Sequence, residues 1–157
     1  MAGLRTDSVI SRSAAATLFA MAMGFVAACG GDDTDDGAAP MRCVERDASA
    51  CTPLYEPTWD RVFSETIQPS CGVPGGACHG DSTAIGASGG FLVTDMDATH
   101  AMLLDGGWVE AGDEQCSELM FRLDTDDNSF LMPPGTQPLA DNERCSVAQW
   151  IAEGANP

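Results

Sequence analysis

The chain has 157 residues, with 24 acidic residues, seven arginines and no lysine, so its formal net charge is −17 at pH 7. A surface this negative repels phosphate backbones, which excludes nucleic acid as a favoured partner and makes a basic protein the expected electrostatic partner. The length suits one modest hydrophobic core rather than two.

The N-terminus has the layout of an export signal. Arg5 and Arg12 precede an apolar run from Ala14 to Ala28, which is shorter than the about 20 residues needed to span a bilayer. The run ends in Val26-Ala27-Ala28-Cys29, which resembles the bacterial lipobox. The resemblance implies that residues 1–28 are a cleaved signal peptide and that Cys29 carries a lipid. An ordinary secretory signal cut nearby is the alternative.

Residues 29–40 differ in composition from the rest of the chain. They contain four aspartates and no bulky apolar residue, which favours an extended, disordered tether. The expected organisation is therefore a signal peptide (1–28), an acidic flexible tether (29–40) and one folded domain (41–157). A lipid on Cys29 would hold the domain at a membrane of the cell envelope, in the periplasm. Because Gly30 follows it instead of aspartate, similarity to sorted lipoproteins favours the outer membrane.

The cysteine count also favours an oxidising compartment. If Cys29 carries lipid, an even number remains, which suits disulfides: Cys43, Cys51, Cys71, Cys78, Cys116 and Cys145. Spacing predicts a local Cys43–Cys51 disulfide and a Cys116–Cys145 disulfide that joins the starts of two helices. Cys71 and Cys78 are left for a short disulfide or for a cofactor.

The folded part is predicted to be mainly α-helical, with long loops. Apolar residues at helical spacing predict a first helix from Thr58 to about Gln68, which Pro69 should stop. A loop rich in glycine, serine and alanine covers residues 71–90. The only segment with strand character is Gly90–Thr94.

Three further helices are expected in the second half of the chain. One runs from Asp95 or Asp97 to Leu104, and another starts near Asp113. The last is capped by Asp141, ended by Gly154, and has a buried side made by Cys145, Val147, Ala148, Trp150 and Ile151.

Three motifs follow one another along this domain. A helix leads to Cys71 and Cys78-His79, a loop reads Leu131-Met132-Pro133-Pro134-Gly135, and the last helix ends Trp150-Ile151-Ala152-Glu153-Gly154-Ala155. Over Trp59–Ala155 the chain resembles small class I c-type cytochrome domains, in particular the cytochrome-c-like modules of Gram-negative bacteria. The resemblance implies haem c attached to Cys71 and Cys78. It makes His79 the proximal and Met132 the distal ligand of the haem iron.

The residue types suit the roles that the resemblance implies, but the spacing of the two cysteines departs from the family pattern. An imidazole beside a covalent anchor loses little entropy on binding iron, and a thioether is a soft ligand that raises the reduction potential. The two prolines after Met132 stiffen the loop that presents it. However, six residues separate Cys71 from Cys78 where the family has two. A haem-free domain in which these cysteines form a disulfide is therefore the alternative.

The leading functional hypothesis is a lipid-anchored, single-haem electron carrier rather than an enzyme. Its haem would lie against an apolar wall of Trp59, Phe63, Leu119, Trp150 and Ile151, and its acidic surface would attract a basic redox partner. The rival is a haem-free structural or protein-interaction module on the same scaffold. His100 is interpreted as structural or exposed. A calcium loop at Asp124–Ser129 and a zinc site at Cys71, Cys78 and His79 are weaker hypotheses.

Overall fold

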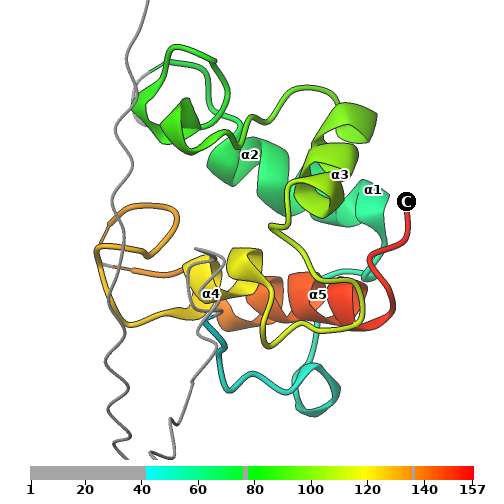
Figure 1. Cartoon of the computed structure of the whole chain (residues 1–157). Helices are drawn as coiled ribbons and strands as arrows, with labels where there is room; N and C mark the ends of the chain where they lie inside the picture. Colours follow the sequence, from blue (N-terminus) through cyan, green and yellow to red (C-terminus); the bar gives the residue numbers. More distant parts are fainter. Residues whose placement is uncertain (1–41, 76–77, 136) are drawn as a thin grey trace, which may run out of the picture. The chain divides into compact units, whose positions relative to one another are not determined.

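The computed structural model describes residues 42–75, 78–135 and 137–157. The predicted signal peptide, Cys29 and the tether lie outside these residues. The expectation of a mainly helical domain is confirmed, and the described ranges contain no strand, so Gly90–Thr94 is loop. No helix in this part of the chain is long and apolar enough to cross a membrane. The helices are α1 (Trp59–Val62), α2 (Gln68–Cys71), α3 (Met96–Asp105), α4 (Glu118–Asp124) and α5 (Asp141–Ala152) (Figure 1).

The first helix continues beyond the point where the sequence predicted its end. α1 and α2 are joined by a π-helical turn at Phe63–Ile67, and the helix ends at Cys71 instead of stopping before Pro69. In an α-helix the proline ring would meet the carbonyl four residues earlier. The wider π-turn shifts the carbonyls just before Pro69, so the ring is accommodated. This extension matters because it carries Cys71 on the helix end.

The two middle helices show how local hydrogen bonds set helix ends. α3 begins as predicted, because the Asp95 side chain accepts a hydrogen bond from the Ala98 N–H at 2.9 Å. α4 begins later than predicted, at Glu118. Its expected start, Asp113, instead forms a turn in which its carboxylate accepts from the Cys116 N–H at 3.0 Å. Cys116 therefore precedes the helix instead of lying on it.

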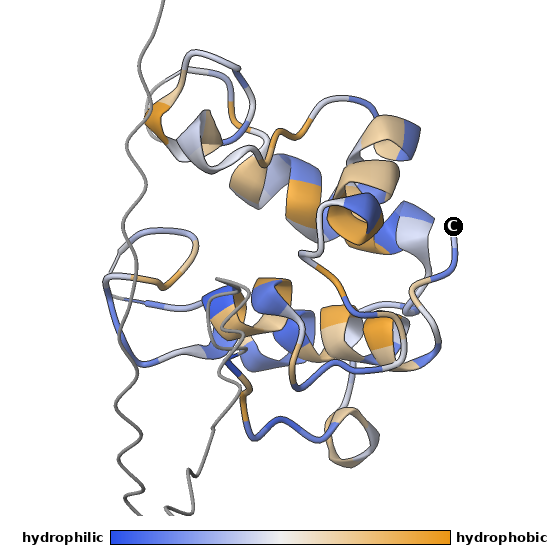
Figure 2. Ribbon diagram, in the orientation of Figure 1, coloured by the Kyte–Doolittle hydropathy of each residue, from blue (hydrophilic) through white to orange (hydrophobic). Residues whose placement is uncertain are grey.

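An aromatic cluster at the centre of the core joins the first and last helices. The rings of Trp59 and Trp150 stack with centroids 5.0 Å apart, and the His100 ring packs 5.1 Å from Trp59. His100 Nε2 is also hydrogen-bonded to the Ala155 carbonyl at 2.8 Å. The interpretation of His100 as a structural residue is thus confirmed. Figure 2 shows hydrophobic residues on the inner sides of the helices that surround this core.

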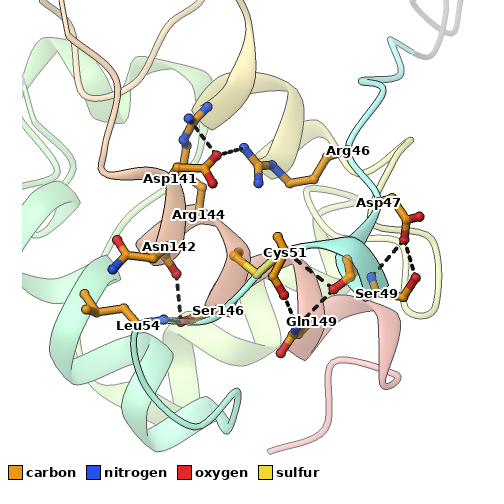
Figure 3. Close-up of a disulfide and its surroundings, with 12 residues drawn as sticks. Arg46, Asp47, Ser49, Cys51, Leu54, Asp141, Asn142, Arg144, Ser146 and Gln149 are labelled. Carbon is orange, nitrogen blue, oxygen red and sulfur yellow. Dashed lines mark hydrogen bonds and ion pairs between the residues drawn. A yellow bond between two sulfur atoms is a disulfide. The ribbon is translucent and has the colours of Figure 1, made fainter.

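The predicted disulfide pairing is wrong. The structure joins Cys43 to Cys116 and Cys51 to Cys145, at sequence separations of 73 and 94. The reason is that the segment leading into α1 runs along α4 and α5 instead of folding on itself. The Val44 N–H donates to the Gln115 carbonyl at 2.8 Å, and Gln149 Nε2 donates to the Cys51 carbonyl at 3.3 Å. Figure 3 shows the second disulfide among these contacts.

A paired Cys51→Ser, Cys145→Ser variant is expected to lose about 4 kcal/mol of unfolding free energy, because the disulfide closes a long loop. Denaturant unfolding of the oxidised protein measures this loss. A non-reducing digest followed by mass spectrometry tests the pairing itself. Recovery of a peptide that links Cys43 to Cys51 would contradict the observed connectivity.

Candidate functional site

An apolar pocket of about 390 Å³ opens between the glycine-rich loop after α2 and the loop after α4. Its volume lies in the range of sites for small molecules and cofactors. In Figure 1 these two loops, green and orange, lie on the same side of the domain. Fourteen residues line the pocket: Cys71, His79, Ile85, Gly86, Ser88, Gly89, Phe91, Leu103, Trp108, Leu119, Arg122, Leu123, Met132 and Pro134.

His79 is held in this wall at three points. Its N–H donates to the Cys71 carbonyl and its carbonyl accepts from the Val93 N–H, both at 2.8 Å. Its ring Nδ1 lies 3.0 Å from the Phe91 carbonyl oxygen. A carbonyl can only accept, so Nδ1 carries the proton of the neutral ring and Nε2 keeps a free lone pair. The geometry therefore prepares His79 as a ligand through Nε2.

The glycine after His79 is required by the close approach of two backbone segments. A Cβ on Gly80 would collide with the Gly72 carbonyl and the Val73 backbone. Because Gly80 has no side chain, the chain can pass close to the backbone that follows α2. This close approach brings His79 back to Cys71 in spite of the intervening loop.

Met132 comes to the same pocket from the other loop. Its N–H donates to the Arg122 carbonyl at 2.7 Å, which attaches the methionine segment to α4. A second, smaller cavity is lined by Ser70, Cys71, Cys78, His79, Met132, Pro133 and Pro134. The two cavities share Cys71, His79, Met132 and Pro134. All four residues predicted at the haem site thus lie at these two cavities.

Neither of the two cysteines at the site is disulfide-bonded. Cys71 is buried, and burial, followed by the nearby Cys78, raises the pKa of its thiol to about 12. Cys78 is half-buried. The short Cys71–Cys78 disulfide of the haem-free alternative is therefore not formed in the structure. Both cysteines are thus free thiols in the structure.

The apolar wall differs from the predicted one. Of the five residues expected there, Leu119 alone lines the pocket, while Trp59, Phe63, Trp150 and Ile151 belong to the core. The wall is instead completed by residues that the sequence analysis did not single out: Phe91, Leu103, Trp108 and Leu123. The signal that could have identified Trp108 is the pair of glycines before it. A Cβ on Gly106 would lie only 2.9 Å from the Trp108 ring, so glycine gives the ring its place.

The residues present fit a haem better than a metal ion held by side chains alone. Within the described ranges, no group of three or more His, Cys, Asp or Glu side chains could hold a metal ion, so the zinc and calcium hypotheses gain no support. One imidazole and one thioether at an apolar pocket are instead the ligand set of a His/Met haem. Two free thiols beside them suit covalent attachment.

Comparison with known proteins gives one match. Residues 76–135 match the family model described as planctomycete cytochrome C. No curated protein and no solved structure matches the chain significantly. The matched segment includes Cys78, His79 and Met132 but begins after Cys71. The similarity therefore supports a cytochrome-c-like domain in this chain.

Proposed function

We propose that the protein is a membrane-anchored envelope lipoprotein whose cytochrome-c-like domain carries a single haem c and transfers electrons. The observation that carries the proposal is the meeting of Cys71, Cys78, His79 and Met132 at the small cavity that shares three of these residues with the apolar pocket. These residues come from two segments, Cys71–His79 and the loop of Met132, which are more than 50 residues apart in sequence. An unrelated surface histidine and loop methionine have no reason to meet there.

Haem bound at this site supplies reversible one-electron chemistry. His79 contributes Nε2 to the iron, with its ring orientation fixed by the Phe91 carbonyl. Met132 contributes a thioether, which favours the reduced state. Cys71 and Cys78 supply the thiols for covalent attachment. Leu103, Leu119 and Leu123 exclude water from the buried side of the pocket.

The rest of the chain supports a carrier more than an enzyme. A net charge of −17 favours electrostatic association with a basic redox partner and disfavours nucleic acid. The lipid on Cys29 would keep the domain at the outer membrane, so that encounters with its partner occur near that surface. No catalytic residue is required for this role.

The test is an absorption spectrum of the oxidised and dithionite-reduced protein, made in a host that attaches c-type haem. We expect a sharp reduced band and a haem stain that stays on the denatured chain. A Cys71→Ser, Cys78→Ser variant should lose the retained stain, because no thioether can form. Met132→Ala should keep the stain but lower the reduction potential, since the soft ligand is lost.

The haem-free module is the second candidate, because six residues separate Cys71 from Cys78. A colourless protein with no free thiols would contradict the electron-carrier proposal and favour this candidate. Thiol titration of the denatured chain before and after reduction distinguishes the two. Reduction releases six thiols from a haem-free form with a Cys71–Cys78 disulfide, but four from a haem form, in which thioethers hold both cysteines.

A further inference from the structure

Arg122 is the only charged side chain among the residues that line the pocket. It lies on α4, and its side chain is about one quarter exposed. The other lining residues are apolar or uncharged. A cation in such a wall costs desolvation energy unless something nearby uses its charge.

The protein satisfies only one edge of this guanidinium. Arg122 Nε donates to Glu118 Oε1 at 2.7 Å, one helical turn earlier, and the guanidinium lies 5.2 Å from the centre of the Phe130 ring. Within the described part of the chain, its terminal nitrogens Nη1 and Nη2 donate to no acceptor. The two terminal nitrogens, which can bind a carboxylate in two places, are therefore available to a ligand.

The negative charge of the whole chain explains why a cation at this position would help an acidic ligand to bind. A pocket ligand that carries a carboxylate would enter a protein with a net charge of −17, which opposes binding. One cation in the pocket wall offsets that repulsion locally, because charges in an apolar site are poorly screened. Arg122 also holds the Met132 N–H through its own carbonyl at 2.7 Å. Its position is therefore fixed relative to the methionine.

We propose that Arg122 is a carboxylate-binding residue of the pocket and selects ligands that carry an acidic group. This inference rests on the proposed function, for which the ligand is haem and the acidic group one of its propionates. Arg122 positions the ligand by this contact and takes no part in iron ligation. The contact is charge-assisted, so its loss should weaken binding about tenfold to a hundredfold.

The experiment uses the full chain made without haem attachment, with metal-free mesoporphyrin and its dimethyl ester as probes. Quenching of tryptophan fluorescence reports binding, because Trp108 lines the pocket. We expect the wild-type protein to prefer the free acid over the ester by about tenfold or more. Arg122→Gln should bind both probes equally, and Arg122→Lys should keep part of the preference. Added salt should reduce the preference of the wild-type protein.

Arg61→Gln is the matched control. Arg61 also pairs with a glutamate one turn away, at 3.3 Å from Glu65, but it is half-exposed and does not line the pocket. It should keep the wild-type preference. Equal binding of acid and ester by the wild-type protein would overturn the role of Arg122 and leave the haem proposal standing. Binding of neither probe would overturn the porphyrin pocket itself.

Discussion

Asp124→Ala is expected to lower the free energy of unfolding by about 3 kcal/mol, because it removes the buried carboxylate that two arginines share and leaves them only the exposed Asp141. Arg46 binds the Asp124 carboxylate with two nitrogens, Nε at 2.8 Å and Nη2 at 2.9 Å, and Arg144 binds the same carboxylate. All three side chains are at most 14% exposed. Water therefore cannot replace the lost carboxylate without rearrangement.

The position of Asp124 strengthens this expectation. It is the last residue of α4, where the helix dipole disfavours a negative charge. The two guanidinium groups offset that cost, and Arg46 connects the segment before α1 to α4 and α5. Figure 3 shows the side of this network at which Arg46 and Arg144 meet Asp141. Glu65→Ala is the matched control, since its ion pair with Arg61 is about half exposed and should contribute at most about 1 kcal/mol. Urea unfolding with the disulfides intact measures both variants. Similar losses in the two would show that the network contributes little.

The same network predicts how stability depends on pH. A hydrogen bond from Arg46 holds the pKa of Asp141 below its usual value. A carboxylate with a lowered pKa stabilises the folded state above its unfolded pKa of about 3.9, and this stabilisation is lost as the pH falls through the folded pKa. The Asp141 contribution should therefore be constant from pH 8 to pH 5 and fade below pH 4. It is small, because Asp141 is 71% exposed.

Most of the helices and the site residues could be predicted because they depend on local signals. The apolar positions of α5 and the cap of α3 are short-range patterns, and the structure confirms both. The predicted cap of α5 is wrong, because Asp141 is the first residue inside the helix and its side chain pairs with Arg46 and Arg144. His79 and Met132 were recognised through the motifs around them, and the pocket brings both together. Motifs that carry ligands keep their local sequence because the ligand itself restricts it.

Features that depend on long-range packing could not be read in this way. Cysteine spacing favoured a local Cys43–Cys51 disulfide. Instead, the segment before α1 runs along α4 and α5, and its two cysteines form disulfides with Cys116 and Cys145. The wall residue Phe91 follows a glycine-rich loop that has no helical or strand period. Nothing in the sequence showed that Arg122, on a helix, lines a pocket.

Under the proposed function, His79→Ala is expected to abolish the low-spin spectrum and to reduce the yield of attached haem roughly tenfold or more, because the iron would lose the one imidazole that lines the pocket. The alanine leaves a space beside the Phe91 carbonyl, which accepts from Nδ1 of the native ring. Added imidazole fits this space and has the same donor for that carbonyl. We therefore expect imidazole to restore the low-spin bands of whatever haem protein is recovered.

His100→Ala separates ligation from stability. His100 does not line the pocket but packs between Trp59 and Trp150 and is hydrogen-bonded to the Ala155 carbonyl. Its loss should lower the free energy of unfolding by about 1–3 kcal/mol and leave the spectrum unchanged. Spectra with and without imidazole, together with urea unfolding, distinguish the two histidines. A wild-type spectrum in His79→Ala would remove this residue from the iron, and a ligand would then have to come from elsewhere in the chain.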